Sequence, residues 1–199
     1  MRFDAVVFVP SAPLLLLGSA PPDLRTTIDE ALEVLVGDVV VVGAAPRQGW
    51  WEGAVDLTPW GVPGTPAADP LPLALAVGRT LLGDRPHRLW GTPGQPPEGD
   101  SILVVADGSA KRSEKAPGGY DPRADQFDAD ICGAIRAGDP RLLESLLDPE
   151  LADELWVGGL PAWQAVGELR KKRVARVLYD DAPFGVGYVV ATWTARRPD

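Results

Sequence analysis

Short apolar runs alternate with amphipathic segments along the first part of the chain. Residues 3–9 and 39–42 are apolar and rich in β-branched side chains, as in strands that are covered on both faces of a parallel sheet. Between them, Asp23 is expected to cap a helix whose apolar side chains, from Leu24 to Leu35, recur every three or four residues. The chain therefore opens with a predicted βαβ unit, for which a right-handed crossover is the rule.

The alternation continues for about half of the chain and then gives way to a series of helices. Residues 71–82 predict a helix, and residues 87–90 and 102–106 predict two more buried strands. After these strands, Gly, Pro and Asp residues separate several short apolar segments. Each of these segments predicts a short helix: 127–135, 142–147, 151–156 and 163–169.

The last part of the chain alternates in the manner of strands. Residues 174–179 and 188–193 flank a turn-forming segment and predict an antiparallel hairpin, which would make the sheet mixed. No internal repeat or linker divides the sequence. The sequence thus predicts a single α/β domain over residues 1–199, with a mostly parallel central sheet, helices on both faces, an additional C-terminal helical layer and a closing antiparallel hairpin.

The segment 44–70 is long for a connection and rich in Pro and Gly, and it carries Trp50, Trp51 and Trp60. It is expected either to pack over a site or to cover an edge of the sheet. Its tryptophans could fasten the segment to the core. Alternatively, they could present an apolar patch to a partner protein or to a second copy of the chain.

Composition limits the range of partners. The chain has 199 residues and a formal net charge of -9, which opposes binding to nucleic acid or to an anionic membrane surface. Its single cysteine, Cys132, cannot form an internal disulfide and is expected to be a core thiol. Asp4, Pro10 and Pro13 interrupt the apolar N-terminal run, which favours a strand and loop over an export signal. A cytoplasmic location is therefore expected.

Candidate chemistry follows from where ligands bind in open α/β sheets, which is beyond the carboxyl ends of the strands. The strand at 102–106 is followed by a segment rich in small, hydroxyl-bearing and basic residues, and the first strand is followed by Ser11. Such a segment could hold a small ligand, including an anionic one, with Asp107 or Lys111 as an acid or base. The predicted ligand-binding residues are Ser11, Asp107, Gly108, Ser109, Lys111 and Arg112.

An alternative for the same segment is a solvated basic loop. Its cations would then pair with nearby carboxylates, and exposed pairs of that kind contribute little to stability. The candidate partners are Glu114, Asp121 and Asp125. If a ligand is bound instead, Lys111→Ala and Arg112→Ala are expected to weaken its binding and to leave folding nearly intact.

The residue inventory restricts the chemistry further. His87 is the single histidine and stands at the start of a predicted strand, at the wrong end of the sheet for a site. A single histidine rules out any iron site that needs two histidines, and it rules out a Ser-His-Asp enzyme elsewhere in the chain. No metal or cofactor site is predicted, although a carboxylate site for Mg²⁺ or Mn²⁺ formed by Asp107, Asp180 and Asp181 stays open.

Several segments together resemble the LigB-like family of class III extradiol ring-cleavage dioxygenases. They are Pro10–Leu15, Val39–Gly43, Asp107–Ser109 and Gly187–Ala191, which between them span nearly the whole chain. The sequence is most similar to a compact actinobacterial branch, which has elements like Gly108–Pro117 and Asp121–Ala124 here. Memo proteins share this fold, so the resemblance implies the fold and the pocket position but not an activity.

In ring-cleaving members of that family, histidines bind ferrous iron and act as acid or base. Ser11 stands at the first of these positions, a segment from Ala44 to Pro46 at the second, and Ala110 at the third. The resemblance thus implies the pocket position without the iron site, and the leading hypothesis is a relative that binds a small ligand in that pocket. The alternatives are a repurposed enzyme (a metal-independent or carboxylate-metal hydrolase or transferase, or a divergent ring-cleavage dioxygenase) and an interaction protein that uses the tryptophan-rich segment.

Two observations would separate these hypotheses. A buried Asp107 or Lys111 with a strongly shifted pKa would favour the enzyme. Exposed tryptophans in the segment 44–70 would favour the interaction protein.

Overall fold

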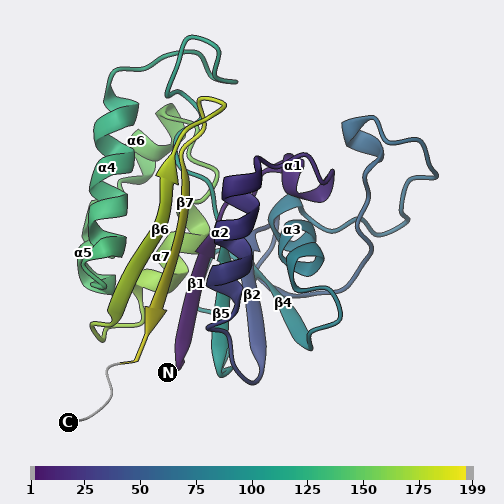
Figure 1. Cartoon of the computed structure of the whole chain (residues 1–199), viewed down its shortest axis with the longest axis horizontal. Helices are drawn as coiled ribbons and strands as arrows, with labels where there is room; N and C mark the ends of the chain where they lie inside the picture. Colours follow the sequence, from purple (N-terminus) through teal and green to yellow (C-terminus); the bar gives the residue numbers. More distant parts are fainter. Residues whose placement is uncertain (1–2, 196–199) are drawn as a thin grey trace.

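A mixed β-sheet forms the centre of the molecule (Figure 1). The computed structural model describes residues 3–195, and within them the sheet has seven strands in the order β3-β4-β2-β5-β1-β7-β6. The four central strands are parallel to one another, whereas β3 and β7 run antiparallel to their inner neighbours. The strands are β1 (Ala5–Val9), β2 (Val39–Ala44), β3 (Gly49–Trp51), β4 (His87–Thr92), β5 (Ser101–Val105), β6 (Val174–Asp181) and β7 (Tyr188–Thr194).

The continuous apolar runs form the central strands, as predicted. All five residues of β1 and of β5 are buried, as are the first five of β2. Helices cover both faces of the sheet, which is why these strands lack the alternation of a half-exposed strand. The hairpin of β6 and β7 joins the edge of β1 and makes the sheet mixed, as expected from its alternating pattern.

Two helical layers enclose the sheet. One layer comes before β5 in the chain and the other after it, and each packs its apolar side chains on one face. The first layer contains α1 (Pro13–Leu16), α2 (Pro22–Leu32) and α3 (Leu73–Leu82). The second contains α4 (Arg123–Arg136), α5 (Pro140–Leu146), α6 (Pro149–Glu154) and α7 (Leu160–Gly167).

Two short elements that the apolar pattern does not predict lie in the segment 44–70. Part of it forms β3, which pairs with β4 and covers that edge of the sheet, and Thr58–Trp60 forms a 3-10 helix. Covering a sheet edge was one of the two roles expected for this segment. The short α1 was also not predicted, because four residues are too few to show a helical period.

The predicted cap of α2 is wrong. This helix begins at Pro22, so Asp23 lies within its first turn and Pro21 is the capping residue. Proline is favoured at the first position of a helix because its missing N–H would have no partner there. The carboxylate of Asp23 still lies at the positive end of the helix dipole.

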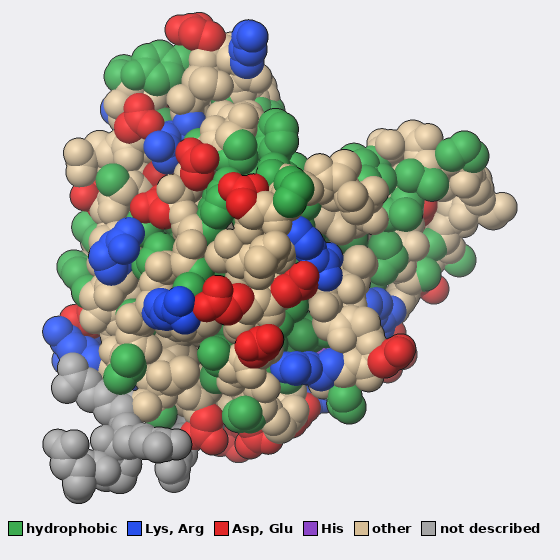
Figure 2. All heavy atoms as spheres, in the orientation of Figure 1, with side chains coloured by type: hydrophobic (Ala, Val, Ile, Leu, Met, Phe, Trp, Pro, Cys, Tyr) green, Lys and Arg blue, Asp and Glu red, His purple; other side chains and the backbone are tan. Residues whose placement is uncertain are grey.

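The chain leaves the adjacent parallel strands β1 and β5 toward opposite faces of the sheet. After β1 it enters α1 and α2, whereas after β5 it enters α4 in the other layer. This divergence is a topological switch point, and such points open a crevice at the carboxyl edge. That edge points upward in Figure 1, and Figure 2 shows the surface hollowed there, above α1.

Within residues 3–195, the structure has no helix that is both long and apolar enough to cross a membrane. The face shown in Figure 2 carries acidic and basic side chains side by side.

Candidate functional site

Ser11 and Asp107 meet at the switch point, as expected from their places after β1 and β5. The backbone N–H of Ser11 donates to Asp107 Oδ1 at 2.7 Å, and the Ser11 hydroxyl donates to Asp107 Oδ2 at 2.7 Å. Two donors from one residue therefore fix both carboxyl oxygens. Each residue keeps part of its surface accessible, so the pair is not sealed inside the core.

The carboxyl group of Asp107 has lost most of its contact with water. This desolvation disfavours the charged form and raises the pKa of Asp107 to about 6, against the opposing effect of the two Ser11 hydrogen bonds. The negative charge of Asp128 adds a smaller upward shift. Asp107 can thus exchange a proton near neutral pH, as a general acid or base must.

Three other predicted ligand-binding residues take part in a buried polar cluster on the face of the sheet that α4 covers. Asp128 on α4 accepts a hydrogen bond from the Ser109 backbone N–H at 2.9 Å and pairs with Arg112 Nη1 at 3.0 Å. The Ser109 hydroxyl donates to the Leu155 carbonyl. Gly108 lies against the same carboxylate, because a Cβ there would be only 2.6 Å from Asp128 Oδ1.

This cluster changes the interpretation of the basic loop. Arg112 pairs with Asp125, as the alternative expected, but its second partner is the buried Asp128. Its guanidinium thus compensates a charge that burial would otherwise make costly. Burial raises the pKa of Asp128, while its hydrogen bonds oppose that change. The space beside Gly108, which could have admitted a ligand, is occupied by the carboxylate of Asp128.

Lys111 lies beside an exposed aromatic ring. Its ammonium group is 5.4 Å from the centre of the Trp156 ring, within the range of a cation–π interaction. Trp156 follows α6, is 56% exposed and has a φ of 56°, which is unusual for a residue other than glycine. Lys111 therefore lies at the side of the site and does not contact the Ser11–Asp107 pair through any hydrogen bond among residues 3–195.

Sequence reasoning missed Asp128 and Tyr188. Asp128 occupies the apolar stripe of its helix, at a spacing of three from Ile131, and a carboxylate on such a stripe signals a buried partner. Tyr188 is the first residue of β7, and burial, together with the charge of nearby Asp107, raises the pKa of its phenol. It looked like an ordinary strand residue, because only the fold brings it to the crevice.

The side chains present do not fit an iron site. Within the described part of the chain, no three His, Cys, Asp or Glu side chains gather closely enough to hold a metal ion. His87 begins β4 at the amino edge, and its Nδ1 lies 2.7 Å from the Arg85 carbonyl oxygen. Asp180 lies beside Cys132 and Arg136, away from Asp107.

Cys132 is a core thiol, as predicted. It is 2% exposed, and its sulfur donates to Asp180 Oδ2 at 3.0 Å. Burial raises the pKa of the thiol to about 12, so the nucleophilic thiolate is scarce at neutral pH.

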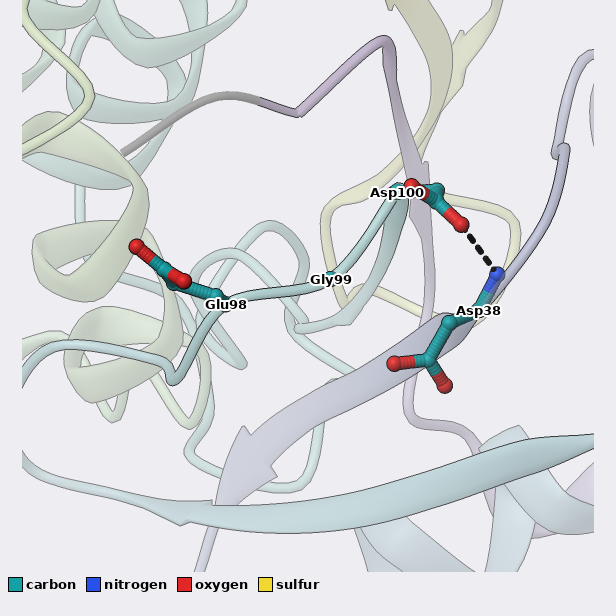
Figure 3. A pocket seen from close by; sticks show the side chains of 4 residues that line it. All are labelled: Asp38, Glu98, Gly99 and Asp100. Atoms are coloured by element: carbon teal, nitrogen blue, oxygen red, sulfur yellow. Dashed lines mark hydrogen bonds between the residues drawn. The ribbon is translucent and has the colours of Figure 1, made fainter.

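An acidic hollow of about 420 Å³ lies at the opposite, amino edge of the sheet (Figure 3). The Asp38 backbone N–H donates to Asp100 Oδ2 at 2.8 Å, and the Asp38 carboxylate pairs with Arg88. In Figure 3 the carboxylate of Glu98 lies apart from the other two. These bonds fasten the starts of β2 and β5 to each other, and the carboxylates do not converge on a common point.

The tryptophans of the segment 44–70 are only partly accessible. Trp50 is 41% exposed, with its ring against Trp90 and the Arg88 guanidinium above it. Trp51 and Trp60 pack against the layer of α1, α2 and α3. They fasten the segment to the core, and only Trp50 presents much of its ring to solvent.

Comparison with models of known protein families finds no match, and a search of curated proteins likewise finds none.

Proposed function

We propose that the chain binds a small polar molecule in the crevice between the ends of β1 and β5, and that Asp107 exchanges a proton with it. The observation that carries this proposal is the Ser11–Asp107 pair, held at a topological switch point with an Asp107 pKa of about 6. A desolvated carboxyl group beside a crevice is a common feature of acid–base sites.

The roles of the two residues differ. Asp107 is the proton acceptor above pH 6 and the proton donor below it. Ser11 holds the carboxyl group in place through both of its oxygens, so no reorientation is needed when a ligand arrives. This arrangement favours the repurposed enzyme over a passive binding protein, because a strongly shifted pKa of Asp107 or Lys111 is the feature that distinguishes the two hypotheses.

The proposed ligand is neutral or cationic. An anion was expected from the cations of the loop, but Arg112 is engaged by Asp125 and Asp128 and Lys111 lies over Trp156. The charged group that faces the crevice is Asp107 itself, and above pH 6 it repels an anion.

The resemblance to the LigB-like extradiol dioxygenases is compatible with this proposal. It implies a ligand pocket at the same edge of the sheet, with Ser11 in place of an iron-binding histidine. We propose a relative that keeps the position of the pocket and uses a carboxyl group in place of iron.

A second candidate function is protein interaction through Trp50. Its 41% exposure and the stacked Arg88 guanidinium support this candidate, since Trp and Arg are enriched at the centres of interfaces. Size-exclusion chromatography with light scattering would detect a second copy bound there. A dimer that Trp50→Ala dissociates would support the candidate, and a monomer at all concentrations would contradict self-association.

The main proposal is tested by a thermal-shift screen of small neutral, cationic and anionic compounds at pH 5 and pH 8. A true ligand should stabilise the wild type to different extents at the two pH values and should lose this pH dependence in Asp107→Asn. Asp84→Asn is the matched control, because it makes the same substitution at an exposed turn between α3 and β4. Ligands that stabilise wild type and Asp107→Asn equally at both pH values would contradict the proposal.

A further inference from the structure

Tyr188 lies where β5 and β7 come together beyond the end of β1. The Gly108 N–H donates to the Gly187 carbonyl at 2.7 Å, and the Gly187 N–H donates to the Ser109 carbonyl at 2.9 Å. These two bonds join the residues that directly follow Asp107 to the residue that directly precedes Tyr188. The first residue of β7 therefore lies close to Asp107.

The side chain of Tyr188 is buried, but its hydroxyl has no hydrogen-bond partner among the described residues. The residue is 4% exposed, and it belongs to the apolar cluster of the α1–α3 layer. Among residues 3–195 its Oη takes part in no hydrogen bond, whereas buried tyrosine hydroxyls normally find a partner. Among the described residues, the side-chain atoms that are sealed from solvent and lack a hydrogen-bond partner are Trp90 Nε1 and Arg173 Nε. Tyr188 Oη does not belong to this group. Tyr188 Oη is therefore not completely sealed, and a water molecule or a ligand group could serve as its missing hydrogen-bond partner.

The two groups have complementary hydrogen-bonding capacity. A carboxylate offers about four lone-pair sites, and Ser11 occupies one on each oxygen of Asp107. The free sites accept hydrogen bonds from a ligand. Tyr188 can donate one hydrogen bond, and the pKa of its phenol is raised by burial and by the charge of Asp107, so it keeps its proton. Asp107 can thus supply an acceptor, and the adjacent Tyr188 can supply a donor.

Building on the proposed function, we infer that the crevice recognises an amide-like group, whose N–H donates to Asp107 while its C=O accepts from Tyr188. An amide carries that donor and that acceptor next to each other and has no net charge. A carboxylate of the same shape has no N–H to donate and is repelled by Asp107 above pH 6. Tyr188 is then a ligand-contacting residue, and the ligand class is a primary amide, a lactam or a similar neutral group.

The test uses two molecules of nearly equal shape, acetamide and acetate. Backbone amide NMR spectra of the full chain are recorded at pH 7.5 while each probe is added up to molar concentration. Acetamide should move the signals of Ser11, Gly108 and Tyr188 in a saturable way, and acetate should move them much less.

Two matched variants identify the phenol that is responsible. Tyr188→Phe should weaken acetamide binding by about 3- to 10-fold, the loss expected for one hydrogen bond between neutral groups. Tyr179→Phe removes the same hydroxyl from the neighbouring strand β6, where the residue is half-buried, and should leave binding unchanged.

The inference is overturned if acetate binds as well as acetamide, if acetamide causes no saturable shift, or if Tyr188→Phe binds it like the wild type. Titration of Asp107 in the same samples separates this failure from that of the proposed function. A midpoint near 6 without acetamide recognition removes only the amide inference, whereas a midpoint near 4 removes the acid–base proposal as well.

Discussion

Replacing Asp107 by Asn should make the stability of the protein less sensitive to pH. The pKa of Asp107 is about 6 in the folded chain and 3.8 without the influence of the fold. The folded state thus holds the proton more tightly than the unfolded state. The favourable contribution of this group to stability is complete below pH 3.8, and it is lost as the pH rises through 6.

The size of the effect follows from the shift of about two pKa units. Each unit corresponds to about 1.4 kcal/mol, which gives an upper value of about 3 kcal/mol between pH 4 and pH 8. Because Asp107 remains partly accessible, a value of about 1–3 kcal/mol is expected. Asn can retain both contacts with Ser11, since its carbonyl accepts from the backbone N–H and its amide donates to the hydroxyl.

The assay is urea unfolding of wild type and Asp107→Asn at a series of pH values from 4 to 8. The free energy of unfolding of the variant, relative to that of the wild type, should increase by this amount across the series. Titration of carboxylates that do not interact with Asp107 affects both proteins equally and cancels in the difference. A difference that is independent of pH, or that changes in the opposite direction, would refute the claim that the carboxylate is desolvated.

The remaining predictions concern the cluster around Asp128. Gly108→Ala should destabilise the fold by about 1–3 kcal/mol, because its Cβ would overlap the carboxylate, whereas Gly133→Ala has open space and should be neutral or stabilising in thermal unfolding. Arg112→Ala should cost about 2 kcal/mol in urea unfolding because it leaves Asp128 without its cation, while Lys111→Ala should cost less than about 1 kcal/mol. Equal effects of the arginine and lysine variants would contradict the assigned roles.

The expectation that both cation variants leave folding nearly intact therefore changes for Arg112. Its partner Asp128 lies 16 residues away on α4, and a sequence pattern does not tell which loop will meet which helix. Ser109 is similar, because its hydroxyl bonds to a carbonyl 46 residues away. Residues that looked like ligand donors are used by the fold itself.

Ser11 and Asp107 could be predicted because their positions depend on strands that are easy to recognise. Each follows a continuous apolar run, and parallel neighbours end at the same edge of a sheet. The apolar pattern also predicts the central strands, since burial on both faces leaves a continuous signal. It does not predict β3, whose three residues pair with β4 at an edge and carry no period of their own.

The most direct test of the central claim is the titration of Asp107 itself. The carboxyl carbon signal is monitored by NMR, and Asp107→Asn is used to assign it. The proposed site predicts a midpoint near pH 6, and a shift of that midpoint when a ligand occupies the crevice. A midpoint at or below pH 4 would mean that water solvates the carboxylate, and the acid–base site would have to be abandoned.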